Sequence, residues 1–171
     1  DITERKRTRE ALRESEEKFR AVVDCAPAII HLKDAEGRFR VVNKAFEDFY
    51  GAPAADALGK TAYDLFPKAQ ADAYTRLDRS VLESGSILVR EVETPVENGE
   101  PRTVRSVRFP IPGAGGEPVG IGVVAEDVTE RKRVEEALKE TTQQLNTAIE
   151  SFSDGFMLFD RDDRFVLSNS A

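Results

Sequence analysis

The sequence predicts an α+β domain built on an antiparallel β-sheet, with a long helix before it and another after it. The strand signals fall in two runs that a stretch of helix signals separates, which is typical of α+β proteins. Turn residues such as Asn98-Gly99 join neighbouring strand segments, which favours antiparallel pairing. A segment near the N-terminus also recurs near the C-terminus, so one whole structural unit lies between the two copies.

The repeat divides the chain. Asp1-Ile-Thr-Glu-Arg-Lys-Arg7 recurs as Asp127-Val-Thr-Glu-Arg-Lys-Arg133, a period of 126 residues, and the match continues without a gap to Asn43 and Asn169. A period this long indicates an array of domains, because solenoid repeats run about 20–50 residues. The apolar residues 156–159 would then lack strand partners within their own unit and be either exposed or paired with another chain. We expect a linker helix over 1–26, one complete domain over 27–129, a second linker helix over 130–150 and the truncated start of a second domain over 151–171.

The elements of the complete domain follow from local signals. Pro27 ends the first helix, and the turn Asp34-Ala-Glu-Gly37 joins two strands over 28–33 and 38–42 into a hairpin. Asn43 is placed to cap a short helix that Gly51 ends. The remaining elements are the short helix over 44–50, short helices over 53–66, a longer helix over 67–83 and strands over 87–96, 102–111 and 119–128.

Both flanking helices carry apolar residues at heptad-like spacings, but only about two heptads are apolar in each. Two interpretations stay open: each helix packs on its own domain, or the helices of two chains pair and form a homodimer. The apolar residues of the two stripes include Leu12, Phe19, Val22, Val134, Leu138 and Leu145.

Composition limits the partners and the cellular location expected for this chain. The net charge of −7 argues against nucleic acid as a partner, because phosphate binding needs a basic face. No apolar run approaches the roughly 20 residues of a membrane span, and the N-terminus does not resemble a signal peptide. The single cysteine, Cys25, excludes an internal disulfide and fits a reducing compartment, so we expect a cytoplasmic location without membrane contact in this segment.

Several segments that connect the predicted elements resemble those of the PAS family. The segment from Val124 to Lys132 looks like a last PAS strand that runs through an Asp-Ile-Thr junction into a signalling helix, with Val128 in place of Ile. The hairpin turn with Asn43-Lys-Ala-Phe46, together with Leu58-Gly59-Lys60 and Phe109-Pro-Ile111, is similar to other joints of the family.

The resemblance implies a five-stranded antiparallel sheet of order 2-1-5-4-3, with helices on one face that enclose a small cavity. Members of the family sense a ligand, cofactor or partner there and pass the change through the last strand to an effector. The effectors are commonly histidine kinases or cyclic-di-GMP enzymes, which would lie outside this segment.

The residues do not fit the usual cofactors of such sensors, and we expect none. Haem sensors carry a histidine on the long helix, which has none here, and His31 lies instead in a predicted strand, where a structural role is expected. Flavin sensors need an Asn-Cys-Arg motif, whereas Cys25 precedes Pro27 and reads as a small buried apolar group. One histidine and one cysteine provide neither a catalytic triad nor a zinc cluster, so no enzyme is expected.

The glycines of Gly120-Ile-Gly122 lie inside a predicted strand. They therefore indicate close packing of a helix against the sheet rather than a dinucleotide-binding loop, which must open a helix.

A cavity that binds a small organic ligand is the main functional hypothesis. Arg105 is its polar candidate, because it alternates with Thr103, Val107 and Phe109 on one strand face, and a buried arginine needs an anionic partner. The alternative is that the same side chains pack together and leave no cavity. The candidates are Ile30, Phe46, Tyr50, Tyr63, Phe66, Tyr74, Leu77, Val89, Arg105, Phe109, Ile121 and Val123.

The sequence thus predicts a non-catalytic sensory input module. Asp127 and Thr129 would couple the sheet to the outgoing helix, by an ion pair and a helix cap respectively. The alternative function is a ligand-free structural module that acts in dimerisation or as a spacer in a larger signalling protein.

Overall fold

The computed structural model describes residues 2–96, 99–151, 155 and 157–168. The chain divides into two compact units, Asp1–Val128 and Thr129–Ala171. Asn98 of the expected Asn98-Gly99 turn lies outside the described residues.

The first unit contains a five-stranded sheet of order β2-β1-β5-β4-β3, and every neighbouring pair of strands is antiparallel. The predicted fold class and strand order are therefore confirmed. Gly37 has a φ of 80° in the β1–β2 turn, a conformation that glycine adopts without strain. The strands are β1 (Ile29–Asp34), β2 (Phe39–Val42), β3 (Leu88–Thr94), β4 (Arg102–Pro112) and β5 (Pro118–Asp127).

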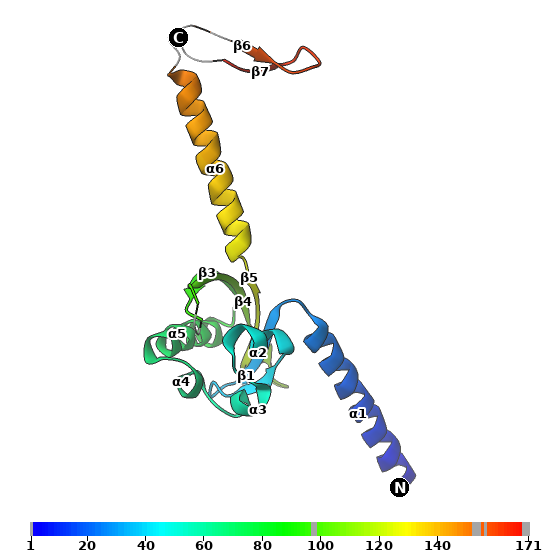
Figure 1. Ribbon diagram of the computed structural model, residues 1–171. Coiled ribbons are helices and arrows are strands. Elements are labelled where there is room, and N and C mark those ends of the chain that lie inside the picture. Colours follow the sequence, from blue (N-terminus) through cyan, green and yellow to red (C-terminus); the bar gives the residue numbers. More distant parts are fainter. Residues whose placement is uncertain (1, 97–98, 152–154, 156, 169–171) are drawn as a thin grey trace. The chain divides into compact units, whose positions relative to one another are not determined.

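Four helices between β2 and β3 cover one face of this sheet, as Figure 1 shows. Gly51 and Gly85 have φ values of 66° and 64° and end the first and last of them, as a residue without a Cβ can. The helices of the unit are α1 (Ile2–Cys25), α2 (Lys44–Tyr50), α3 (Ala54–Ala57), α4 (Ala62–Leu65) and α5 (Lys68–Ser84).

The core lies between these helices and the sheet. Side chains alternate between the two faces of each strand, so one face of β5 contributes Ile121, Val123 and Ala125 to the core. Phe39 of β2 and Phe46 of α2 are among the largest fully buried side chains of the unit. Cys25 was expected to be buried, but it is exposed at the end of α1, because Pro27 and the turn into β1 leave it beyond the core.

Asn43 joins three elements. Its Oδ1 accepts hydrogen bonds from the backbone N–H of Phe46, at 3.0 Å, and of Ile30, at 2.9 Å. Its Nδ2 donates to the carbonyl oxygens of Val23, at 2.9 Å, and Ala28, at 2.8 Å. The predicted N-cap of α2 is therefore confirmed, and the same side chain also binds the end of α1 and the start of β1.

The second unit contains α6 (Thr129–Glu150) and a hairpin of β6 (Met157–Phe159) and β7 (Phe165–Ser168). The expectation that residues 156–159 lack strand partners within their unit is wrong for the described part, because Leu158 pairs with Leu167 and Phe159 with Phe165. The two strands of the hairpin pair with each other, and most of its apolar side chains are exposed, while Leu167 is half-buried.

The two hairpin turns also share their hydrogen bonds across the 126-residue repeat. Asp34 N donates to Arg38 O at 3.0 Å, and Asp160 N donates to Arg164 O at 2.9 Å. In each turn the aspartate Oδ1 accepts from the arginine N–H, at 2.8 Å and 2.9 Å respectively. The repeat in the sequence is thus a repeat in local structure.

Candidate functional site

Three charged side chains meet in the interior of the first unit. The Nζ of Lys33 on β1 lies 2.8 Å from Asp78 Oδ2, and Nη1 of Arg108 on β4 lies 2.5 Å from Asp78 Oδ1. The exposed fractions of the three side chains are 2% for Lys33, 9% for Asp78 and 5% for Arg108. We call these three residues the charged cluster. It combines two basic groups with one carboxylate, inside a protein where unpaired charge is costly.

Local structure brings the cluster together. On β1, Lys33 shares a face with the core residues Ile29 and His31, since side chains two apart point the same way. On α5, Asp78 follows Tyr74 by one helical turn and so points to the same side. Arg108 lies opposite Val123 of β5 in the sheet register and therefore faces the core.

A set of aromatic rings surrounds the charged cluster. Lys33 Nζ lies 4.7 Å from the centroid of the Phe39 ring, and the Arg108 guanidinium carbon lies 5.7 Å from that of Tyr74, so both cations face the π-systems of rings. Neighbouring ring centroids lie 4.8 Å to 5.5 Å apart along the set. The rings belong to His31, Phe39, Phe46, Tyr50, Phe66 and Tyr74.

A void of about 10 Å³ lies between these rings and the two cations of the charged cluster, Lys33 and Arg108. It is large enough for about one water molecule and too small for an organic ligand. Two polar atoms of residues that line it, His31 Nδ1 and Arg108 Nε, are buried without a hydrogen-bond partner among the described residues. Such groups usually bind a water or a ligand, because an unpaired polar atom in the interior is destabilising.

Burial sets the protonation of this region. It lowers the pKa of His31 well below 6.5, and the nearby charges of Lys33 and Arg108 lower it further, so His31 is neutral at pH 7. Burial also lowers the pKa of Lys33 from 10.5, while Asp78 acts in the opposite direction. The pKa of Tyr50 is raised well above 10 by burial and by Tyr74, so its hydroxyl stays protonated.

Two larger hollows adjoin the interior. One, of about 370 Å³, is mostly apolar, and Tyr50 and Phe66 line both this hollow and the small void. We call it the aromatic-side hollow. Its other lining residues are Leu65, Pro67, Gln70, Pro95 and Val96.

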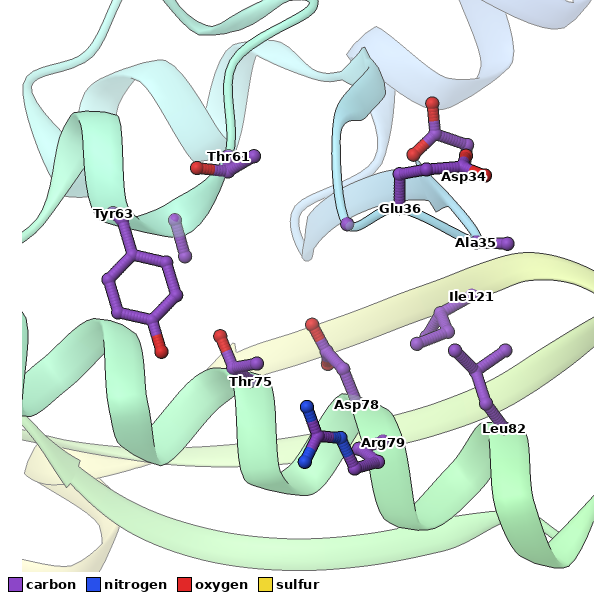
Figure 2. Close-up of a pocket in the computed structure, with 12 residues that line it drawn as sticks. Asp34, Ala35, Glu36, Thr61, Tyr63, Thr75, Asp78, Arg79, Leu82 and Ile121 are labelled. Carbon is purple, nitrogen blue, oxygen red and sulfur yellow. The ribbon is translucent and has the colours of Figure 1, made fainter.

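The other hollow, of about 210 Å³, lies between the β1–β2 turn and α5. Figure 2 shows Thr75 and Asp78 on α5 facing the turn with Asp34 and Glu36 across this space. The carboxylates of Asp34 and Asp78 are already paired, with Arg40 and with the charged cluster respectively. The hollow is therefore a weaker candidate for a ligand site than the interior.

Four of the predicted cavity residues, Phe46, Tyr50, Phe66 and Tyr74, line the small void. Ile121 and Val123 lie in the core beside it, and Ile121 also lines the hollow of Figure 2. Leu77 is half-buried on α5.

The remaining candidates lie away from the void. Arg105 is exposed and faces the opposite side of the sheet from Arg108, because strand neighbours alternate. Val89 is 44% exposed and pairs with Val107 on that outer face, and Ile30 lies on the face of β1 opposite His31. Tyr63 is 52% exposed on α4, and its hydroxyl donates to Asp72 at 2.8 Å.

Phe109 covers a glycine on the outer face. It lies opposite Gly122 in the register, and a Cβ built on Gly122 would lie 2.3 Å from Phe109 Cε2. The expectation that a helix packs on this glycine is therefore wrong, because the close neighbour is an aromatic side chain of the adjacent strand.

Sequence reasoning missed Lys33, Phe39, Asp78 and Arg108. On β4, the outward set with Val107 and Phe109 is more apolar than the inward set, so the pattern favoured the wrong face. A usable signal existed on α5, where Asp78 interrupts an apolar stripe of Ala71, Tyr74 and Val81.

The predicted junction follows the end of β5. Arg102 Nη1 of β4 donates to Asp127 Oδ2 at 3.1 Å, so this ion pair lies within the sheet. Thr129 is the first residue of α6.

The described residues contain no group of three or more His, Cys, Asp or Glu side chains placed to hold a metal ion. Among the described helices, none has the length and apolar character that crossing a membrane requires.

Residues 23–133 match the sequence pattern of the PAS fold family. The chain belongs to the PAS family. The match includes all five strands of the sheet, the charged cluster and the junction after β5.

Curated relatives are much longer than this PAS chain. The methanogenesis regulatory histidine kinase FilI of Methanothrix harundinacea is 33% identical over 118 residues, which cover 69% of this chain and 13% of FilI. The uncharacterized protein y4lL of Sinorhizobium fredii is 34% identical over 128 residues, which cover 73% of this chain and 15% of y4lL. The similarity therefore spans a small part of each relative.

A solved PAS domain has the same fold. The PAS domain of Bordetella pertussis BvgS superposes with a TM-score of 0.60 at 26% identity, covering 77% of this chain and 98% of that domain. The chain is thus a PAS domain of the kind found in signalling proteins, related to the PAS regions of sensor histidine kinases.

Proposed function

We propose that this chain is a non-catalytic sensory input module, in which a small ligand or partner at the interior changes β5 and, through β5, the helix that follows. The observation that carries the proposal is the continuity of β5. This strand contributes Ile121 and Val123 beside the charged cluster, and only Val128 separates its end from the start of α6. A displacement of β5 would therefore reach α6 without an intervening loop.

The junction is tied to the sheet on the side of β4. Val128 is 2% exposed, and its N–H donates to Thr103 O at 2.8 Å. Together with the pair of Arg102 and Asp127, this bond holds the end of β5 and Val128, the last residues before α6, against β4. Such coupling supports a relay through the Asp127-Val128-Thr129 junction.

The proposal includes partners. Exposed apolar residues on α1 and α6 support a homodimer formed through the flanking helices. The similarity to FilI supports a histidine kinase as the downstream effector, and the proposal places this chain in a cytoplasmic part of a larger protein. The exposed apolar residues are Leu12, Phe19, Val22, Val134, Leu138 and Leu145.

A fusion protein tests the relay. The full chain is joined to the catalytic region of a histidine kinase, and autophosphorylation is compared for Asp127→Ala, Thr129→Ala and Glu126→Ala. Glu126 is the matched control, since it is an exposed neighbour on the same strand. We expect the first two substitutions to change activity several-fold and the control to leave it unchanged, with equal urea midpoints for the chain alone. Equal activity in all three variants would overturn the relay.

A ligand-free spacer or dimerisation module is the second candidate. The observation that favours it is the small size of the interior void, about 10 Å³. Native mass spectrometry of the purified chain separates the two functions. A co-purified small molecule supports the sensor, and a chain of unmodified mass that no compound stabilises supports the spacer.

A further inference from the structure

We propose that the charged cluster is the recognition site for a monocarboxylate with a compact apolar or aromatic body. The carboxylate would bind Arg108 and Lys33 as a second anion beside Asp78, and the body would lie in the aromatic-side hollow. This inference rests on the proposed function, because it assumes that the interior binds a ligand, and it names the chemical class of that ligand.

The first argument is charge balance. With Lys33 protonated, the cluster holds two cations against the single carboxylate of Asp78, and all three side chains are at least nine-tenths buried. The other groups that line the void do not offset the excess, since burial keeps His31 neutral and the Tyr50 hydroxyl protonated at pH 7. One added negative charge neutralises the excess positive charge of this interior, and a monocarboxylate supplies one such charge.

The second argument is the unpaired donor. Arg108 uses Nη1 on Asp78, but its Nε has no hydrogen-bond partner in the described part of the chain and belongs to a residue that lines the void. A guanidinium can hold a carboxylate by two parallel N–H···O bonds, and Nε is one of its five N–H donors. His31 Nδ1, also buried and unpaired, lies on the wall of the same void and offers a further polar contact to the anion.

The third argument is room. The void itself admits about one water molecule, but Tyr50 and Phe66 separate it from the aromatic-side hollow of about 370 Å³. Rotation of these two rings would join the two spaces, and the joined space reaches the size of a small-molecule site. The hollow is lined mainly by Leu65, Phe66, Pro67, Pro95 and Val96, so it fits an apolar body and not a second charge.

The experiment is isothermal titration calorimetry of the full chain with phenylacetate, hexanoate and phenylacetamide. We expect one-to-one binding of the two acids. The neutral amide has almost the same shape as phenylacetate, so it should bind at least about tenfold more weakly, because it cannot balance the charge.

Lys33→Met is the decisive variant, because it leaves Arg108 and Asp78 as a balanced pair. It should therefore fold with a urea midpoint equal to or above that of the wild type, yet bind the acids at least about tenfold more weakly. Lys60→Met, which removes an exposed lysine, is the matched control and should bind as the wild type does. Arg79→Gln reports on the hollow of Figure 2 and should also leave binding unchanged.

Three outcomes overturn the inference: neither acid binds, the amide binds as tightly as phenylacetate, or Lys33→Met binds as tightly as the wild type. In the second and third outcomes a ligand still occupies the chain, so the proposed sensor function survives. The fusion assay of Asp127 and Thr129 needs none of these compounds, so a failed relay is recognised separately.

Discussion

Lys33 Nζ lies 2.8 Å from Asp78 Oδ2 and joins the first strand to the long helix across 45 residues of sequence. The second oxygen of the same carboxylate accepts a hydrogen bond from Arg108 of β4. One buried carboxylate therefore links two strands and a helix around the interior void. Substitutions can test this link, together with the burial of His31, the hydrogen bonds of Asn43 and the contact of Gly122 with Phe109.

Asp78→Asn should destabilise the domain strongly. The substitution leaves two buried cations without a counter-ion, and breaking a buried ion pair in this way typically costs about 3–5 kcal/mol. Urea denaturation measures the loss. Asp72→Asn on the same helix is the control, since its partners Lys68 and Tyr63 are both exposed, and it should leave the midpoint unchanged. An equal midpoint for wild type and Asp78→Asn would show that the cluster does not support the fold.

The stability should depend on the protonation of His31. Its folded-state pKa lies well below 6.5, so between that pKa and 6.5 the unfolded chain binds a proton that the folded chain does not. The free energy of unfolding is therefore highest above pH 6.5 and falls as the pH drops below it, by at most about 1.4 kcal/mol per pH unit from this group.

Urea midpoints between pH 7.5 and 5.5 check the sign. His31 is the only histidine of the chain, so His31→Gln should flatten this part of the profile. Profiles of equal slope for the variant and the wild type would contradict the expected protonation.

Asn43→Asp should separate the two roles of this side chain. The aspartate keeps an oxygen that can accept from the Phe46 and Ile30 N–H groups, but it cannot donate to Val23 O and Ala28 O. We expect α2 to remain and the end of α1 to exchange its amide hydrogens faster.

Asn43→Ala removes both roles and should cost at least about 2 kcal/mol, the sum of a lost cap and unpaired buried groups. Hydrogen exchange followed by mass spectrometry distinguishes the two variants. Unchanged exchange near Val23 in Asn43→Asp would mean that these donor bonds do not hold α1.

Gly122→Ala should destabilise β5. The new Cβ would lie 2.3 Å from Phe109 Cε2, so the ring must shift, at a cost of about 1–3 kcal/mol. In a Phe109→Ala background the space is free, and the same substitution should be close to neutral. A double-mutant cycle in urea measures the coupling, and additive effects would contradict the contact.

Local residues predicted much of this fold. Asn43, Gly51 and the β1–β2 turn marked their elements correctly, because caps and turns are satisfied by neighbours in the sequence. The five-stranded order and the helices on one face followed from the resemblance to the PAS family and are confirmed by the structure. The pairing of β6 with β7 within their own unit was not expected, although the turn between them repeats that of Asp34.

The candidate site was predicted only in part. The aromatic residues Phe46, Tyr50, Phe66 and Tyr74 were identified because apolar rings near predicted helices point to a core. Arg105 was chosen in place of Arg108, since both faces of β4 carry apolar residues and a slip of one position reverses every side chain.

The sequence by itself determined the elements, their order and the 126-residue repeat, because turn, cap and periodicity signals act over a few residues. Only the tertiary structure decided which charges enter the core. Lys33, Asp78 and Arg108 lie on three separate elements, and the two cations are tolerated in the interior because each of them pairs with Asp78. Such mutual compensation depends on the register of β1, β4 and β5 and on the rotation of α5, which no local signal specifies.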